Sequence, residues 1–151
     1  MMEFSIRPIG IIHSPFTDRK DTPIQPTRSS AMGNVELYAE FVEGLRDIEG
    51  FSHLILLYAF HCSQGYSLTV KPFLDNQLHG LFATRYPCRP NPIGLSIVRL
   101  LARENHILKI EGVDVLDGTP LLDIKPYVPE FDLRTGVRTG WLENRNQQKR
   151  I

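Results

Sequence analysis

The chain has 151 residues, which is enough for one domain with a single hydrophobic core. Apolar residues make up 42% of it and charged residues 23%, a globular balance that excludes a disordered chain. The formal charge is zero, with 17 basic and 17 acidic residues, so the overall charge does not indicate a nucleic-acid-binding protein.

The N-terminal part predicts two strands on either side of a long loop. The strands are expected over Phe4–Ile12 and Asn34–Ala39. The loop from Ser14 to Gly33 is rich in Pro, Thr, Ser and Asp, and at about 20 residues it exceeds an ordinary connection, so we expect it to be functional or disordered. Glu40–Asp47 predicts one short helix, closed by a turn at Gly50.

The middle of the chain predicts a central strand with shorter ones around it. Phe51–Phe60 is almost continuously apolar, which is typical of a strand buried on both faces. Tyr66–Val70 and Gly80–Thr84 are expected to form short strands. Ile93–Leu101 predicts another strand through its β-branched residues, although Ile93–Arg103 also tolerates a helix.

The C-terminal part predicts a hairpin. His106–Val115 and Pro120–Ile124 flank an Asp-Gly turn, a strong hairpin signal in which Asp117 serves the turn itself. Many short strands and little helix favour a mainly β, single-domain, small β-barrel, because closure removes exposed strand edges. An open sheet with a partner on its edge is the alternative. No glycine-rich fingerprint follows a strand, so the fold is expected to be non-Rossmann.

The distribution of charge predicts the domain division, and the absence of export signals predicts the cellular location. Residues 134–151 carry a net charge of +4 and the first 133 carry −4, so we expect a barrel domain over 1–133 and a basic tail over 134–151. The tail either follows phosphates or is simply solvated. No signal peptide and no apolar run of ~18 residues is evident, which predicts no membrane partner and a cytoplasmic location with Cys62 and Cys88 reduced.

The most unusual stretch is residues 80–96, GLFATRYPCRPNPIGLS. Its three prolines fix φ and remove backbone donors, so residues 86–92 cannot form a regular strand. The stiff segment holds Arg85, Arg89 and Asn91 with little freedom, and a rigid guanidinium suits recognition of a carboxylate or phosphate. A proline loop that only turns the chain is the alternative interpretation.

Further polar residues lie next to the expected core strands. Asp123 alternates with apolar neighbours, so it is expected to be paired or functional rather than idle, with a solvated strand face as the alternative. His61 directly follows the central strand. The five histidines and two cysteines have no ligand-like spacing, so no metal site is predicted.

Two long blocks of the sequence resemble a known family. GLFATRYPCRPNPIGLSIVRL and VDVLDGTPLLDIKPYVP, together with IRPIGIIHSPF, PIQPT and EGFSHLILLYAFH, are similar to blocks of the tRNA N6-threonylcarbamoyladenosine methyltransferase (TrmO-like) family. The resemblance covers about residues 5–128. It implies a small β-barrel, acting as a homodimer, that uses S-adenosylmethionine to methylate N6 of threonylcarbamoyladenosine beside the anticodon of tRNA.

The resemblance also implies a set of cofactor contacts. They would be Gln25, Pro26, Thr27, His61, Cys62, Arg85, Leu95, Glu111, Gly112, Val113 and Asp114. Because the sulfonium is a strong methyl donor, catalysis chiefly needs in-line positioning of the target nitrogen. That nitrogen must also lose a proton, for which Asp123 is the first expected base and His61 the second.

Substrate contacts are expected from the proline-rich segment, the hairpin and the tail. They are Arg89, Asn91, Lys125, Arg138 and Trp141. Trp141 could stack on an anticodon loop, or it could instead pin the tail to the barrel or to a partner subunit. Two other functions stay open: a non-catalytic nucleotide- or RNA-binding barrel, and a small-molecule hydrolase with Asp/His acid–base chemistry, which lacks a nucleophile motif.

Overall fold

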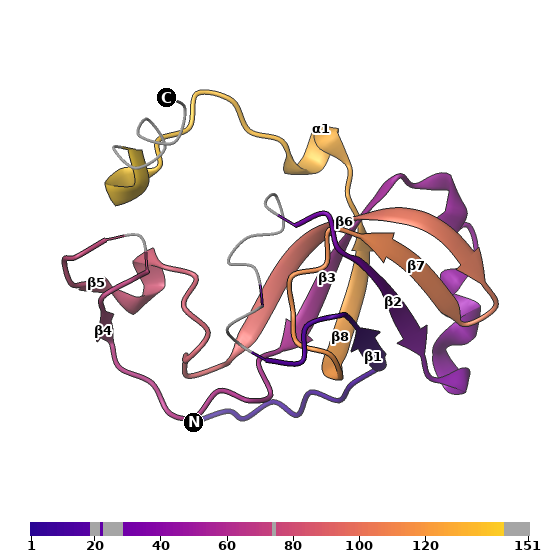
Figure 1. Ribbon diagram of the computed structural model, residues 1–151, viewed down its shortest axis with the longest axis horizontal. Helices are drawn as coiled ribbons and strands as arrows, with labels where there is room; N and C mark the ends of the chain where they lie inside the picture. Colours follow the sequence, from indigo (N-terminus) through magenta and orange to yellow (C-terminus); the bar gives the residue numbers. More distant parts are fainter. Residues whose placement is uncertain (19–21, 23–28, 74, 144–151) are drawn as a thin grey trace. The chain divides into compact units, whose positions relative to one another are not determined.

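Six antiparallel strands close into a barrel in the computed structural model, which describes residues 1–18, 22, 29–73 and 75–143 (Figure 1). The strands are β1 (Gly10–His13), β2 (Met32–Leu37), β3 (His53–Ala59), β6 (Ile93–Glu104), β7 (Ile107–Glu111) and β8 (Thr119–Pro126). Their order is β1-β2-β7-β6-β3-β8, and β8 pairs again with β1. The mainly β barrel is therefore confirmed, and the open sheet is excluded.

The chain divides into two units. The barrel belongs to the first, made of residues 1–66 and 87–127, and the second combines residues 67–86 with the described residues from 128 onward. None of the helices in the described part is long and apolar enough to cross a membrane.

Alternation along the strands fills the barrel. On β3, Leu54, Leu56 and Tyr58 are buried, whereas Ile55 and Leu57 between them are only half-buried. The expectation of burial on both faces was therefore wrong, because a closed barrel gives each strand one inner and one outer face. The other side chains of the core include Ile12, Val35, Leu108, Ile110 and Leu121.

The predicted hairpin between residues 106–115 and 120–124 does not form. β7 pairs with β2 and β6, and β8 pairs with β1 and β3. The true hairpin is β6–β7, which turns at Asn105 with φ 55°. The Asp-Gly turn nevertheless exists, with Gly118 at φ 83° and a hydrogen bond from Thr119 N to Leu116 O of 3.2 Å. This turn ends the segment of residues 112–118, which connects β7 to β8. In the barrel, β6 and β3 lie between these two strands.

Three other elements differ from their predicted form. β1 begins at Gly10 rather than Phe4, and Pro8, which has no N–H to donate, lies in the unpaired part. The helix predicted over Glu40–Asp47 is two 3₁₀ helices, η3 (Ala39–Leu45) and η4 (Ile48–Gly50). The alternative helix over Ile93–Arg103 is excluded by β6, which extends to Glu104.

The second unit contains little regular structure. β4 (Thr69–Val70) and β5 (His79–Gly80) form a two-stranded sheet, followed by η5 (Leu81–Ala83) where a strand over Gly80–Thr84 was predicted. The described residues after 127 include the short helices α1 (Pro129–Asp132) and η6 (Gly140–Leu142).

Trp141 fastens the C-terminal segment within this second unit. Its Nε1 donates to the Ala83 carbonyl at 2.8 Å, and its ring stacks on His79 with 4.6 Å between centroids. His79 Nε2 is in turn 2.7 Å from Asp75 Oδ2. The pinning role expected for Trp141 is therefore present, but the contact is to the β4–β5 region of its own unit.

Gly94 on β6 lets two aromatic rings approach the strand. A Cβ at this position would lie 2.3 Å from the Tyr58 ring and 2.7 Å from the Phe60 ring. These two rings pack edge to face, 5.6 Å between centroids. Gly94→Ala is therefore expected to lower the free energy of unfolding by about 1–3 kcal/mol through overpacking, measured by urea denaturation.

The matched control is Gly44→Ala, because no atom lies within 4 Å of a Cβ built there. Its stability should be unchanged or slightly raised. Equal stability of the Gly94 and Gly44 variants would contradict the packing argument.

Candidate functional site

One end of the barrel gathers several of the predicted site residues. β1, β3 and β7 end there and β2, β6 and β8 begin there, since His13 pairs with Asn34, Ala59 with Ile93, and Glu111 with Met32. The connecting segments 14–31, 60–66, 87–92 and 112–118 therefore all leave the barrel at this end, which we call the loop end.

A buried carboxylate lies at the loop end. Asp114 is 9% exposed and is the only buried charged side chain among the described residues. Ser96 Oγ on β6 donates to Asp114 Oδ1 at 2.6 Å, and Tyr58 Oη on β3 lies 2.6 Å from the same Ser96 oxygen. All three groups sit at the margin of an apolar core, where a polar group is costly unless it is hydrogen-bonded.

Burial changes the acidity of this carboxyl. Desolvation raises the pKa of Asp114 from 3.8 to about 6, while the hydrogen bond from Ser96 acts in the opposite direction. Asp114 therefore titrates just below neutral pH. Carboxyl groups with such raised pKa values are concentrated at binding and catalytic sites.

Two serines fasten the long loop to the residues on either side of Asp114. Ser14 Oγ donates to the Val115 carbonyl and Ser29 Oγ to the Val113 carbonyl, each at 2.6 Å. Each serine oxygen also accepts a backbone N–H two residues further on, at 3.2 Å. We call these two arrangements the serine clamps. They fix both ends of the loop to the segment that carries the buried acid.

His13 adds a third fastening at the same place. Its Nε2 lies 2.8 Å from Glu36 Oε2 on β2, and its Nδ1 lies 3.5 Å from Asp117 Oδ1. Asp117 Oδ1 also accepts the Ser14 N–H at 3.0 Å. The turn residue Asp117 therefore also anchors the start of the long loop.

The structure brings some of the predicted cofactor residues together. Glu111, Gly112, Val113 and Asp114 form one run at the end of β7. His61 and Cys62 follow β3 at the loop end and are exposed. Cys62 and Cys88 are not joined in a disulfide. Among the described residues no group of three or more His, Cys, Asp or Glu side chains is placed to hold a metal.

Other predicted residues lie elsewhere. Leu95 neighbours Ser96 but points to the outer face of β6, where it is 45% exposed. Arg89 and Asn91 are in the loop-end segment 87–92, whereas Arg85 and Arg138 are exposed residues of the second unit. Gln25, Pro26 and Thr27 lie outside the described residues.

Asp123 and Lys125 are on the outer face of β8. The register shifts where Leu57 and Tyr58 of β3 meet β8, so that beyond this bulge Ile124 packs on the core and its two neighbours point outward. Lys125 Nζ lies 2.9 Å from Asp123 Oδ2, and this contact raises the pKa of the lysine. Asp123 is thus paired with a cation.

Sequence reasoning missed Tyr58, Ser96 and the serine clamps. Ser96 did carry a signal, because it occupies an inward position between Gly94 and Val98 of an apolar strand. A polar residue at a core position needs a partner, and that partner is Asp114. The clamp serines carry no comparable signal, since loops rich in serine are common.

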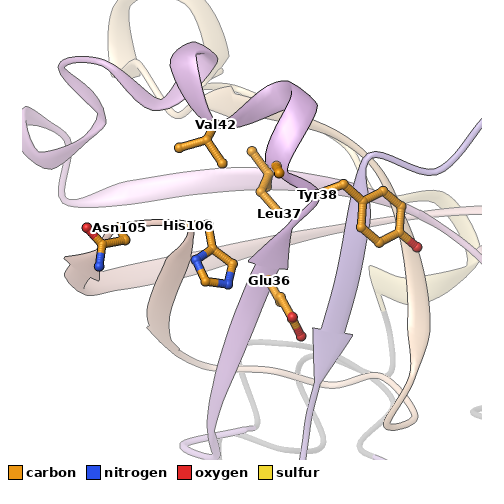
Figure 2. A pocket seen from close by; sticks show the side chains of 7 residues that line it. Glu36, Leu37, Tyr38, Val42, Asn105 and His106 are labelled. Carbon is orange, nitrogen blue, oxygen red and sulfur yellow. The ribbon is translucent and has the colours of Figure 1, made fainter.

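A shallow pocket of about 390 Å³ lies at the opposite end of the barrel (Figure 2). It is lined by Glu36, Leu37, Tyr38, Ala39, Val42, Asn105 and His106. These residues come from the end of β2, the start of η3 and the β6–β7 turn. It is therefore separate from the loop end.

Strands closed into a barrel, with a buried acid between the attachment points of the two serine clamps, define a non-Rossmann β-barrel domain with a candidate ligand site. The chain belongs to the tRNA-methyltransferase O N-terminal domain family, which matches residues 11–133. The resemblance seen in the sequence is thereby confirmed.

Relatives and solved structures agree with this assignment. A probable S-adenosyl-L-methionine-binding protein of Pyrococcus abyssi is 61% identical over 138 residues, 91% of this chain and 75% of that protein. The tRNA (adenine(37)-N6)-methyltransferase of Escherichia coli is 41% identical and matches 85% of this chain and 60% of its own length. A crystal structure of TrmO from Pseudomonas aeruginosa matches with a TM-score of 0.78 and 44% identity, over 92% of this chain and 62% of that one. The chain thus spans about three fifths of the length of these last two proteins.

Proposed function

We propose that this chain binds S-adenosylmethionine at the loop end and methylates N6 of threonylcarbamoyladenosine 37 in tRNA, as a cytoplasmic homodimer. Support comes from the family and from relatives named as S-adenosylmethionine-binding proteins and as a tRNA methyltransferase. The observation that carries the proposal is the buried Asp114 carboxylate, with both neighbouring carbonyls held by the serine clamps.

The residues of the loop end fit such a cofactor. S-adenosylmethionine bears a sulfonium and an ammonium group together with ribose hydroxyls, and when bound it supplies an electrophilic methyl group. An ionised carboxylate accepts hydrogen bonds from ammonium and hydroxyl groups. A cationic ligand would also offset the desolvation that raises the pKa of Asp114.

We propose, beside Asp114, the further cofactor contacts that the family resemblance implies. They are Gln25, Pro26, Thr27, His61, Cys62, Arg85, Leu95, Glu111, Gly112 and Val113. Arg85 would bind the cofactor carboxylate through its planar fork, for which a lysine is not an equivalent.

Of the two candidate bases, His61 is now favoured. It is exposed and lies at the loop end, close in sequence to the end of β3. Asp123 is held by Lys125 on the outer face of β8, so it would have to leave this partner before it could accept a proton from the target nitrogen.

Contacts with tRNA are proposed for five residues of the two units, Arg89, Asn91, Lys125, Arg138 and Trp141. Their cationic and aromatic side chains suit phosphates and unstacked bases. One face of the Trp141 ring already stacks on His79, so only its other face would be available to a base.

Dimerisation is proposed through the outer face of the β3–β6 ladder. Ile93, Leu95 and Ile97 are 37%, 45% and 39% exposed there, next to half-buried Ile55 and Leu57 on β3. An apolar strip of this kind is typical of a protein contact. Light scattering measures the mass in solution, and a monomer at micromolar concentration would overturn this part of the proposal.

The activity test follows a tritiated methyl group from labelled S-adenosylmethionine into tRNA with and without the threonylcarbamoyl group. Label is expected only in the threonylcarbamoylated tRNA. Cofactor binding without transfer to either tRNA would favour a non-catalytic barrel. A companion test is mass spectrometry of the purified protein, which detects bound S-adenosylmethionine or its demethylated product. If the protein has no affinity for the cofactor, the hydrolase function would be favoured instead.

A further inference from the structure

Three buried polar side chains are joined by hydrogen bonds at the wall of the barrel. Tyr58, Ser96 and Asp114 are 3%, 2% and 9% exposed, and they come from β3, β6 and the segment after β7. Consecutive oxygen atoms are 2.6 Å apart in both links. These two hydrogen bonds join three side chains that are far apart in the sequence into one buried unit, which we call the polar chain.

The polar chain has a single direction when the acid is ionised. A carboxylate only accepts hydrogen bonds, so the one hydroxyl hydrogen of Ser96 points to Asp114. Tyr58 must then donate to Ser96, because the serine has no second hydrogen. Both hydroxyls therefore support the negative charge, and each link strengthens the next by polarisation.

The local sequence is adapted to this arrangement. Gly94 leaves room for the Tyr58 ring against β6, since any Cβ there would collide with it. A phenylalanine at position 58 would pack as well against the core without needing a partner, so the hydroxyl contributes something other than packing. Ser96 points into the barrel, and the next inward residues on β6 are Gly94 on one side and Val98 on the other.

Among the described residues, no charged side chain stabilises the negative charge of Asp114. Burial, Ser96 and the backbone N–H of Asp114 itself set the pKa of its carboxyl, and no charged side chain of the described residues shifts this pKa. Tyr58 is the titratable group that faces the carboxylate through Ser96.

We propose that Tyr58 and Ser96 are positioning residues, which hold the Asp114 carboxylate ionised and in one orientation for a cationic ligand at the loop end. The identity of that ligand as S-adenosylmethionine rests on the proposed function. The inference adds two residues that the ligand does not touch.

The first test is calorimetric titration with S-adenosylmethionine between pH 5 and pH 8, so that the α-ammonium group of the ligand keeps its proton over most of the range. Wild-type affinity is expected to rise as the pH passes through about 6 and then to level off. Ser96→Ala should move this midpoint upward by about one pH unit, because a hydrogen bond to a charged group is lost, and affinity should recover near pH 8. Tyr58→Phe should move it in the same direction by less, and Ser96→Thr should restore it.

A merely structural role predicts a different result. Affinity would then fall by the same factor at every pH, and the midpoint of Ser96→Ala would match the wild type. Either observation overturns the inference. Near-ultraviolet circular dichroism confirms that each variant has kept its tertiary packing.

A second measurement needs no ligand and therefore separates the inference from the proposed function. Carbon-13 NMR follows the titration of the Asp114 carboxyl directly, with Asp114→Asn to assign the signal. Its midpoint is expected to rise in Ser96→Ala even if S-adenosylmethionine does not bind. An unchanged midpoint would contradict the inference. A raised midpoint in a protein that does not bind S-adenosylmethionine would support the inference and contradict only the proposed function.

Discussion

Asp114→Asn is expected to weaken S-adenosylmethionine binding about 10- to 100-fold at pH 8. The amide keeps the shape of the side chain and can still accept the hydrogen bond from Ser96. It loses the negative charge, and hydrogen bonds that involve a charged group contribute roughly 1.5–3 kcal/mol. Titration calorimetry measures the change, and affinity within twofold of the wild type would exclude Asp114 from the site.

The same substitution is expected to alter how stability depends on pH. The folded-state pKa of Asp114, about 6, lies above the ordinary value of 3.8, so the folded protein binds this proton more tightly than the unfolded chain. The contribution of Asp114 to stability is therefore fully present below about pH 4 and is lost as the pH rises through 6. By pH 8 the loss is about 3 kcal/mol.

Urea unfolding at pH 4.5 and pH 8 checks this sign. The free energy of unfolding of Asp114→Asn, relative to the wild type, should become more favourable by about 2 kcal/mol between the two pH values, because part of the loss already occurs below pH 4.5. Asp123→Asn is the matched control, because Asp123 lies on the outer face and pairs with Lys125. The difference is then specific to the buried acid, and parallel pH curves for Asp114→Asn and the wild type would contradict it.

Leu56→Ala is expected to lower the free energy of unfolding by about 2–5 kcal/mol. Leu56 is 1% exposed on the inner face of β3, at the centre of the strand that pairs with both β6 and β8. Truncation loses the burial of the removed carbons and leaves a cavity in a closed wall that can relax little. Urea denaturation measures the effect.

Leu101→Ala is the control for this core substitution. Leu101 lies on β6 and is 40% exposed, so the same chemical change removes less buried surface. Its cost should stay near or below about 1 kcal/mol. Equal costs for the two variants would mean that the inner face of β3 is not the core.

Local sequence was sufficient to predict the long strands β3 and β6 but not to predict which strands pair. The continuous apolar run ending in Phe60 predicted β3, and the β-branched residues after Ile93 predicted β6. Neither pattern reports which strands meet. The Asp-Gly signal at Asp117 therefore identified a turn correctly and a hairpin wrongly, since β8 returns to β1 and β3.

The candidate site was predictable where it is continuous in sequence. Glu111–Asp114 could be carried over from a family block as one run. The bonds that support it join distant residues: Ser14 and Val115 are 101 positions apart, and Ser29 and Val113 are 84 apart. Hydrogen bonds across such separations depend on barrel closure, which no local window of the sequence contains.

The serine clamps make the attachment of the long loop independent of the side chains within it. Both attachment points are hydroxyl-to-carbonyl bonds at the loop's own ends, and neither uses the side chains between Ser14 and Ser29. Substitutions or insertions between them leave the attachment bonds unchanged. The attachment of this loop to the barrel is therefore expected to tolerate changes in the composition and length of the segment between the two serines.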